Sequence, residues 1–260
     1  MRDLPWDGCP NVRDLGGLVT PLSPTGRTLT GRVARGPRRE RLTAAGWTAA
    51  RAWGVRTVVD LRCADEVGPR DGDPVVPQAA HDGVTVVAAP TEDRADPEFR
   101  RTCFPILDSP EYWPHNWRIL PDLVRTALEA VADARPGVLV HCSAGRDRTG
   151  MISALLLGHA GVSPDDVADD YAASVRAMAG RPSHAPTADR QQTWTTAQVE
   201  SWVSRTTPLV AEVAARTEEA FDAVGLATEH RRRLRALLTA TTAGDDRRES
   251  PRHAGIASVG

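Results

Sequence analysis

The densest group of chemically reactive side chains lies in one stretch, residues 141–150, with the sequence HCSAGRDRTG. It carries a thiol at Cys142, a guanidinium six positions later at Arg148 and a hydroxyl at Thr149. A cysteine thiolate is a strong nucleophile, and a planar guanidinium can hold two oxygens of one phosphate. The spacing therefore predicts a phosphate-binding loop with Cys142 beneath the phosphorus atom, placed for in-line attack.

The segments on either side predict how this loop is held. Val138 to Val140 is a short apolar strand, and residues 149–159 form an apolar helix. Ligands of α/β proteins bind at such strand ends, and the free N–H groups of the loop and the first helical turn attract an oxyanion. The expected phosphate-binding residues are Ser143, Ala144, Gly145, Arg146, Asp147 and Arg148.

The same positive environment favours the thiolate form of Cys142, and Thr149 is expected to donate a hydrogen bond to its sulfur. Because the loop and Arg148 supply positive charge, no metal ion or other cofactor is implied. The four cysteines also show no metal-ligand spacing and no disulfide framework.

The remaining pattern predicts an α/β fold with a mostly parallel central sheet flanked by helices. Strands are expected at 55–61 and 84–89, and helices at 42–53, 111–134 with a kink or restart at Pro121, from Ser163 onward, 197–204, and 208–241 with a break near Gly225. Residues 1–242 are expected to form one domain, with a catalytic core at 11–178 and a helical extension at 196–241. Residues 180–195 are predicted to be a loop, either a connector or a substrate lid, and residues 243–260 a disordered tail.

Composition limits the partners. The net charge of −2 gives no bulk attraction to nucleic acid or anionic membranes. No apolar run is long enough to span a bilayer, and the first residues do not resemble a secretory signal. We expect a cytoplasmic protein, monomeric or weakly oligomeric. All 32 basic residues are arginine, which is typical of a GC-rich, and hence bacterial, coding sequence.

The loop, Cys-x5-Arg-Thr-Gly, resembles that of the protein tyrosine phosphatase superfamily. Asp147 directly before Arg148 resembles its bacterial tyrosine and dual-specificity branch, as do NVRDLGG at 11–17 and VVDLR at 58–62. The resemblance implies a three-layer phosphatase fold, a cysteinyl-phosphate intermediate and a phosphorylated substrate. Arg146 stands where lysine is common, and Arg35-Gly36-Pro37 replaces the usual Arg-Ser, so both positions are candidates for unusual specificity.

The resemblance also implies an aspartic acid that protonates the leaving group. In the branch this residue lies about three positions after a proline, which corresponds to Asp93 after Pro90. Asp147, inside the loop, is the alternative. Trp113-Pro114 resembles the acid loop of the mammalian-type enzymes, but His115 follows and the segment begins a helix, so we interpret it as coincidental.

Other residues near these motifs have expected supporting roles. Arg13 and Asp14 are expected to brace the loop, Asp60 to brace it from its strand, and His141 to fix it through backbone hydrogen bonds. Gly16 and Gly17 are expected to form a turn.

Four functions compete at this stage. The leading hypothesis is hydrolysis of phosphotyrosine or phosphoserine/threonine in proteins. A small-molecule phosphatase acting on a nucleotide, sugar phosphate or phosphoinositide would use the same mechanism. A sulfurtransferase and a non-catalytic phosphate-binding module are more remote, because Arg148-Thr149-Gly150 and the intact Cys142 argue against them.

Overall fold

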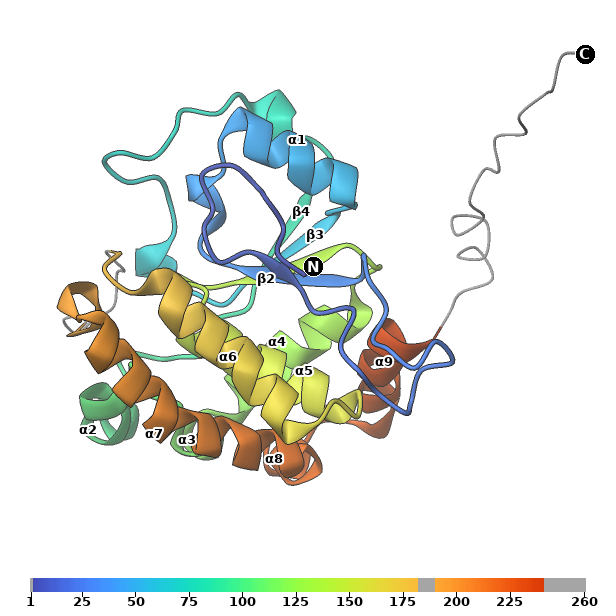
Figure 1. Ribbon diagram of the computed structural model, residues 1–260, viewed down its shortest axis with the longest axis vertical. Coiled ribbons are helices and arrows are strands. Elements are labelled where there is room, and N and C mark those ends of the chain that lie inside the picture. Colours follow the sequence, from blue (N-terminus) through green and yellow to red (C-terminus); the bar gives the residue numbers. More distant parts are fainter. Residues whose placement is uncertain (1, 182–189, 241–260) are drawn as a thin grey trace, which may run out of the picture.

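The computed structural model describes residues 2–181 and 190–240, and within them a mixed sheet separates two layers of helices (Figure 1). The sheet order is β1-β2-β5-β3-β4. The strands are β1 Arg13–Asp14, β2 Val33–Gly36, β3 Thr57–Asp60, β4 Thr85–Ala88 and β5 Val138–His141. Among the strands of the described residues, only β1 runs antiparallel to its neighbour, so the predicted α/β fold with a mostly parallel sheet is confirmed.

The register places β5 at the centre of the sheet. His141, its last residue, lies opposite Gly36 of β2 on one side and opposite Asp60 of β3 on the other. All four residues of β5 are buried, as expected for a central parallel strand covered on both faces. The chain that follows β5 is therefore flanked by the segments that leave β2 and β3.

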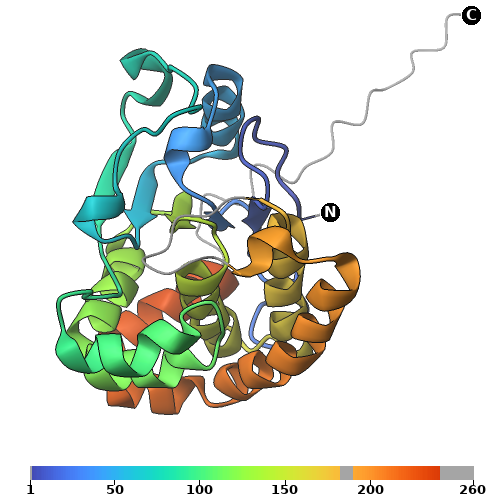
Figure 2. The same ribbon diagram turned by 90° about the vertical axis from the view of Figure 1, so that its left-hand side faces the viewer.

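The helices are unequally divided between the two faces. They are α1 Ala44–Trp53, α2 Pro97–Cys103, α3 Tyr112–Ile119, α4 Pro121–Asp133, α5 Asp147–His159, α6 Pro164–Met178, α7 Thr196–Ala215, α8 Thr217–Ala223 and α9 Thr228–Thr239. Helix α1 covers one face over a small apolar cluster that includes Trp6, Trp47 and Leu139. The others lie on the opposite side, where α5 is buried beneath α6 and α7 (Figures 1 and 2).

Several predicted boundaries are confirmed, and their causes are local. Helix α1 ends at Gly54, whose φ of 117° is a left-handed cap. The Ser163 hydroxyl accepts a hydrogen bond from the backbone of Asp166 and so begins α6. A new helix starts at Pro121, and another break lies between α8 and α9 around Gly225.

The predicted break before Pro208 is wrong, because Pro208 lies inside α7. Pro208 leaves the carbonyl oxygen of Ser204 without its helical N–H partner, but residues on both sides of it, Trp202 and Val210 among them, are buried, and this packing keeps the helix continuous. The helix ends instead at Ala215. In the predicted loop 180–195, residues 190–193 form a short 3-10 helix, whereas 182–189 and the tail 243–260 lie outside the described residues. The strands β1 and β2 and the helix α2 were not predicted.

Candidate active site

The ten-residue loop lies where the sequence placed it, between the end of β5 and the start of α5. Cys142 follows β5 directly and is only 3 % exposed, and α5 begins at Asp147, so Arg148 and Thr149 are in its first turn. Gly145 has a φ of 69°, and a Cβ there would lie 2.4 Å from the carbonyl carbon and oxygen of Gly36. Only glycine fits this turn.

The carbonyl oxygens of the loop are held by donors from the N-terminal part of the chain. Ser143 O accepts from the backbone N–H of Arg38 at 3.0 Å. Asn11 Nδ2 donates to Ala144 O and Gly145 O, both at 3.2 Å, and Arg35 Nη2 donates to Gly145 O at 2.6 Å. Since C=O and N–H point in opposite directions in a trans peptide, these bonds leave the N–H groups of the loop facing the other way, as an anion site requires.

Arg35 belongs to a buried group that we call the Asp170 cluster, formed by Arg2, Arg13, Arg35 and Asp170. The carboxylate of Asp170, on α6, pairs with Arg35 at 2.6 Å, Arg2 at 2.9 Å and Arg13 at 3.2 Å. Burial alone would raise the pKa of Asp170, but Arg13, Arg35 and Arg2 outweigh it and hold the pKa below its usual range.

The prediction that Arg13 braces the loop is partly correct, and the same prediction for Asp14 is wrong. Arg13 reaches the loop indirectly, since its Nη1 bonds to Asn11 Oδ1. Asp14 does not contact the loop: it accepts from the backbone N–H groups of Gly16 and Gly31 and from the indole of Trp53. Arg35 is not in an open pocket but is 1 % exposed, behind the loop.

A second group, the Glu66 cluster, holds Arg148 and consists of Glu66, Glu92, Arg94 and Arg148. Both terminal nitrogens of Arg148 bond to the Glu66 carboxylate, Nη2 at 2.7 Å, and Arg94 pairs with the same carboxylate at 2.8 Å. Such a two-point bond fixes the guanidinium plane. The carboxylate of Glu92 lies 3.6 Å from Arg148 Nη1.

The two carboxylates of this cluster differ in their titration. Burial opposes ionisation of Glu66, but the hydrogen bond and charge of Arg148, with Arg94, lower its pKa below the usual value. Glu92 is 5 % exposed, and burial, reinforced by the negative charge of Glu66, raises its pKa. Sequence reasoning did not identify either glutamate; the only signal was their position just after the expected strands.

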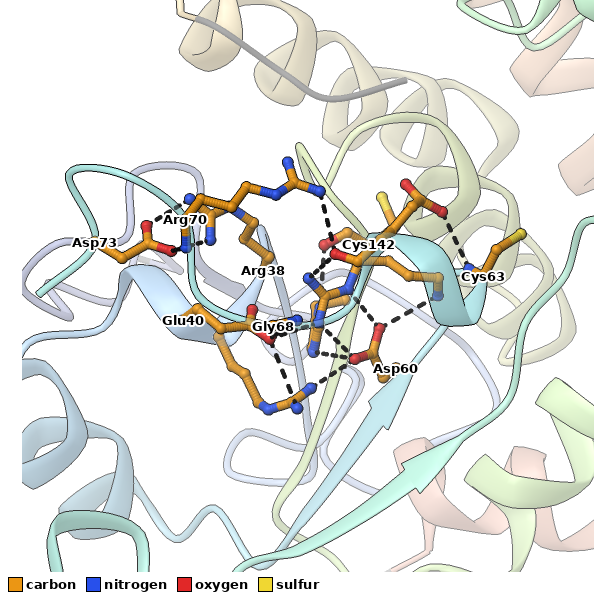
Figure 3. Close-up of polar contacts among 12 residues, drawn as sticks. Arg38, Glu40, Asp60, Cys63, Gly68, Arg70, Asp73 and Cys142 are labelled. Atoms are coloured by element: carbon orange, nitrogen blue, oxygen red, sulfur yellow. Dashed lines mark hydrogen bonds and ion pairs between the residues drawn. The ribbon is translucent and has the colours of Figure 1, made fainter. Parts of the chain in front are cut away.

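Asp60, labelled in Figure 3, is the last residue of β3. It pairs with His141, the last residue of β5. Asp60 accepts hydrogen bonds from Arg62 and Arg39, and its carboxylate is 3.7 Å from His141 Nε2. Burial lowers the pKa of His141 to about 4, so the ring is neutral near pH 7. Its Nδ1 lies 3.0 Å from the carbonyl oxygen of Cys142, which is the backbone contact expected of this residue.

The structure separates the two candidate acids. Asp93 is exposed, and its carboxylate accepts the backbone N–H of Ala95 at 2.8 Å; its neighbour Glu92 faces Arg148 instead. Asp147 lies in the loop, next to Arg146 at 3.0 Å and 3.4 Å from the hydroxyl of Tyr171. Asp147 is thus part of the loop itself, whereas Asp93 belongs to a separate turn one residue after Glu92.

The structure also places Thr149 and Arg146 of the loop and the Trp113-Pro114 motif. Thr149 Oγ1 is buried and has no hydrogen-bond partner among the described residues, so its hydroxyl is available as a donor. Arg146 is 2 % exposed. Trp113 is a core residue of α3 that packs edge-on against Tyr171, with ring centroids 5.6 Å apart, which agrees with its interpretation as coincidental.

Within the part of the chain that the structure describes, one group has the residue types of a metal site. Cys63 Sγ and carboxylate oxygens of Glu66 and Glu92 lie within 4.8 Å of one another. Arg148 and Arg94 already bond to Glu66, so a cation would have to displace two guanidinium groups that carry the same sign of charge. These residues therefore do not fit a resident metal ion.

Comparison with known proteins agrees with this geometry. A model of the tyrosine phosphatase family matches residues 4–240. The chain belongs to this family. Like its other members it is a cysteine-based phosphatase, a hydrolase of phosphoric monoesters.

Two relatives illustrate the likeness. The triple specificity protein phosphatase PtpB of Mycobacterium tuberculosis is 31 % identical over 201 residues, which cover 66 % of this chain and 68 % of the relative. A tyrosine-protein phosphatase of Nostoc commune is 33 % identical over 142 residues, covering 55 % of this chain but only 48 % of the relative. Within residues 2–181 and 190–240, no helix combines the length and apolar character needed to cross a bilayer.

Proposed function

We propose that Cys142 is the nucleophile of this phosphatase and that Arg148 holds the phosphate. The thiolate forms a bond to phosphorus while the ester P–O bond breaks, and the leaving oxygen takes a proton from an acid. Water then attacks the cysteinyl phosphate and releases inorganic phosphate and the thiolate. The observation that carries this proposal is the two-point bond from Glu66, which orients Arg148 beside a buried Cys142.

Asp147 is the better candidate for the acid. Its place inside the loop, one residue before Arg148, keeps it near any bound phosphate, whereas Asp93 is bonded to its own turn. Thr149 would donate its free hydroxyl to the sulfur, and the N–H groups from Ser143 to Arg148 would bind the phosphate oxygens.

The relatives' names, a triple specificity protein phosphatase and a tyrosine-protein phosphatase, favour phosphoproteins as substrates. For this chain we propose tyrosine or dual specificity. We further propose that residues 1–242 act as one domain, which the family match to 4–240 supports, in the cytoplasm of a bacterium. We also propose a monomer or weak oligomer that does not bind nucleic acid, because the net charge of −2 gives no bulk attraction to a polyanion.

The first experiment is release of phosphate from p-nitrophenyl phosphate by the wild type and by Cys142→Ser, with EDTA present and vanadate as inhibitor. We expect turnover that EDTA leaves intact, vanadate blocks and the variant lacks. Turnover that persists in Cys142→Ser would refute the nucleophile assignment.

The second experiment compares Asp147→Asn with Asp93→Asn. General acids contribute about 10²–10⁴-fold, most for a poor leaving group, so phenyl phosphate is the substrate to use. We expect kcat to fall about 100-fold or more for Asp147→Asn and less than about twofold for Asp93→Asn. The reverse order would assign the role to Asp93.

A further inference from the structure

The Asp170 cluster has an unusual charge balance for a buried group. Three guanidinium groups share one carboxylate; Arg2 is partly exposed to solvent, but Arg13 and Arg35 are both buried, so one buried positive charge is left in excess. A buried charge normally requires a partner of opposite sign, and leaving one without it is costly. The arrangement is expected where another negative group completes the balance.

Arg35 is the member of the cluster that reaches the loop. Its Nη1 bonds to Asp170 Oδ2 and its Nη2 to Gly145 O, each at 2.6 Å. The side chain is 1 % exposed. Burial lowers the pKa of Arg35 to about 10, and both Asp170 and the thiolate of Cys142 oppose that shift. Arg35 therefore lies close enough to Cys142 for their charges to interact.

We propose that Arg35 is a positioning residue of the catalytic loop: its guanidinium fixes the carbonyl oxygen of Gly145 and supplies a buried positive charge that favours the Cys142 thiolate. This inference rests on the proposed function of the loop and extends it to a residue on β2. The fork of the guanidinium matters because its two ends bond to different groups. The charge matters because the cluster holds more positive than negative groups.

The register of the sheet explains why β2 carries this residue. Arg35 pairs with Val140 of β5, two residues before Cys142, so its backbone is fixed beside the loop. Arg13 pairs with Arg35 from β1 and bonds to Asp170 and Ser174 of α6. The strand pair and α6 thus hold the Arg35 guanidinium from two sides.

The test compares Arg35→Met, Arg35→Lys and the matched control Arg2→Met, which removes a charge from the same carboxylate without touching the loop. Two measurements are made on each folded protein, with thermal unfolding as the check of folding. The rate of Cys142 alkylation by iodoacetamide is followed against pH by mass spectrometry of the Cys142 peptide. The second measurement gives KM and kcat for p-nitrophenyl phosphate.

We expect the midpoint of the alkylation profile to rise by about one pH unit in Arg35→Met, because a nearby positive charge is lost. In Arg35→Lys the charge remains, so the midpoint should stay within about half a unit, while KM rises about fivefold or more because one ammonium replaces the fork. Arg2→Met should change neither.

An unchanged midpoint in folded Arg35→Met would overturn the role of the charge. If that variant does not fold, Arg35→Lys decides, and wild-type KM in Arg35→Lys would overturn the positioning role. Alkylation does not require turnover, so it tests Arg35 even if the wild type fails to hydrolyse p-nitrophenyl phosphate. A wild type that does not hydrolyse p-nitrophenyl phosphate would contradict the proposed function and leave the test of Arg35 by alkylation intact.

Discussion

The Asp170 cluster and the Glu66 cluster flank the phosphate loop on the two sides of β5 and are built from the same residue types. The first places three arginines on one carboxylate. The second places two carboxylates around Arg148 and Arg94. One side of the loop therefore has an excess of positive charge, and the other is balanced.

The pKa values of the buried carboxylates Asp170 and Glu92 are shifted in opposite directions. Asp170 and Glu92 are both buried, yet the pKa of Asp170 lies below its usual value and that of Glu92 above it. Burial raises both, so the number and distance of the arginines decide the sign. The balanced side fixes the geometry of Arg148, and the positive side supports negative charge in the loop.

The largest effect on activity is expected from Glu66→Gln. The amide keeps one acceptor oxygen but turns an NH₂ group toward Arg148, so the two-point bond is lost. We expect kcat/KM for p-nitrophenyl phosphate to fall about 100-fold, as for a misplaced catalytic group. Glu98→Gln is the control, because Glu98 pairs with Arg118 at the surface. A loss under threefold would mean that Arg148 does not depend on Glu66.

The largest effect on stability is expected from Asp170→Asn, which leaves three arginines without their carboxylate. Removing one partner of a buried ion pair costs about 3–5 kcal/mol in the free energy of unfolding. Denaturation by urea at pH 7 measures it, with Asp169→Asn, an exposed neighbour on α6, as the control.

The pH dependence of that difference has a definite sign. Because the pKa of Asp170 is lowered in the folded protein, its stabilisation is present above the usual aspartate range and is lost as pH falls through that range toward the folded pKa. The difference in the free energy of unfolding between wild type and Asp170→Asn should therefore decrease below about pH 4. A constant gap down to pH 3 would contradict the assigned shift.

Glu92→Gln should show the opposite sign. The raised pKa of Glu92 means that the folded protein binds its proton more tightly than the unfolded chain, so the wild type loses stability as pH rises through the folded pKa. Gln cannot titrate. The free energy of unfolding of the variant should therefore rise relative to that of the wild type between pH 4 and pH 8, by on the order of 1 kcal/mol. A gain that shrinks with rising pH would show that Glu92 is stabilised as a carboxylate.

The two clusters also show which parts of the site can be predicted from the sequence. The loop was predictable because Cys142, Arg148 and Thr149 are contiguous, and the caps at Gly54 and Ser163 act locally. The supports of the loop are distant: Asn11 and Gly145 are 134 positions apart, and Arg148 and Glu66 are 82 apart. These pairs depend on the strand order β2-β5-β3, which periodicity does not reveal.

The features that the sequence did not predict also depend on tertiary contacts. The strand β2 has the sequence VARG, in which a charged residue and a glycine hide the strand pattern. Glu92, one position before the predicted acid Asp93, is the carboxylate that faces Arg148. This pairing depends on the tertiary structure and could not be seen in the sequence.

The smallest effect is expected from Arg2→Met. This variant tests whether the excess positive charge of the Asp170 cluster stabilises the Asp170 carboxylate or the loop. Arg2 is 24 % exposed, so its bond to Asp170 is partly screened and should contribute less than about 1 kcal/mol to the free energy of unfolding. Its loss would leave two buried arginines and one carboxylate, still with positive charge in excess. Urea denaturation at pH 7, beside Asp170→Asn, measures the difference. A cost above about 2 kcal/mol would mean that Asp170 needs all three arginines, and that the excess charge stabilises this carboxylate rather than the loop.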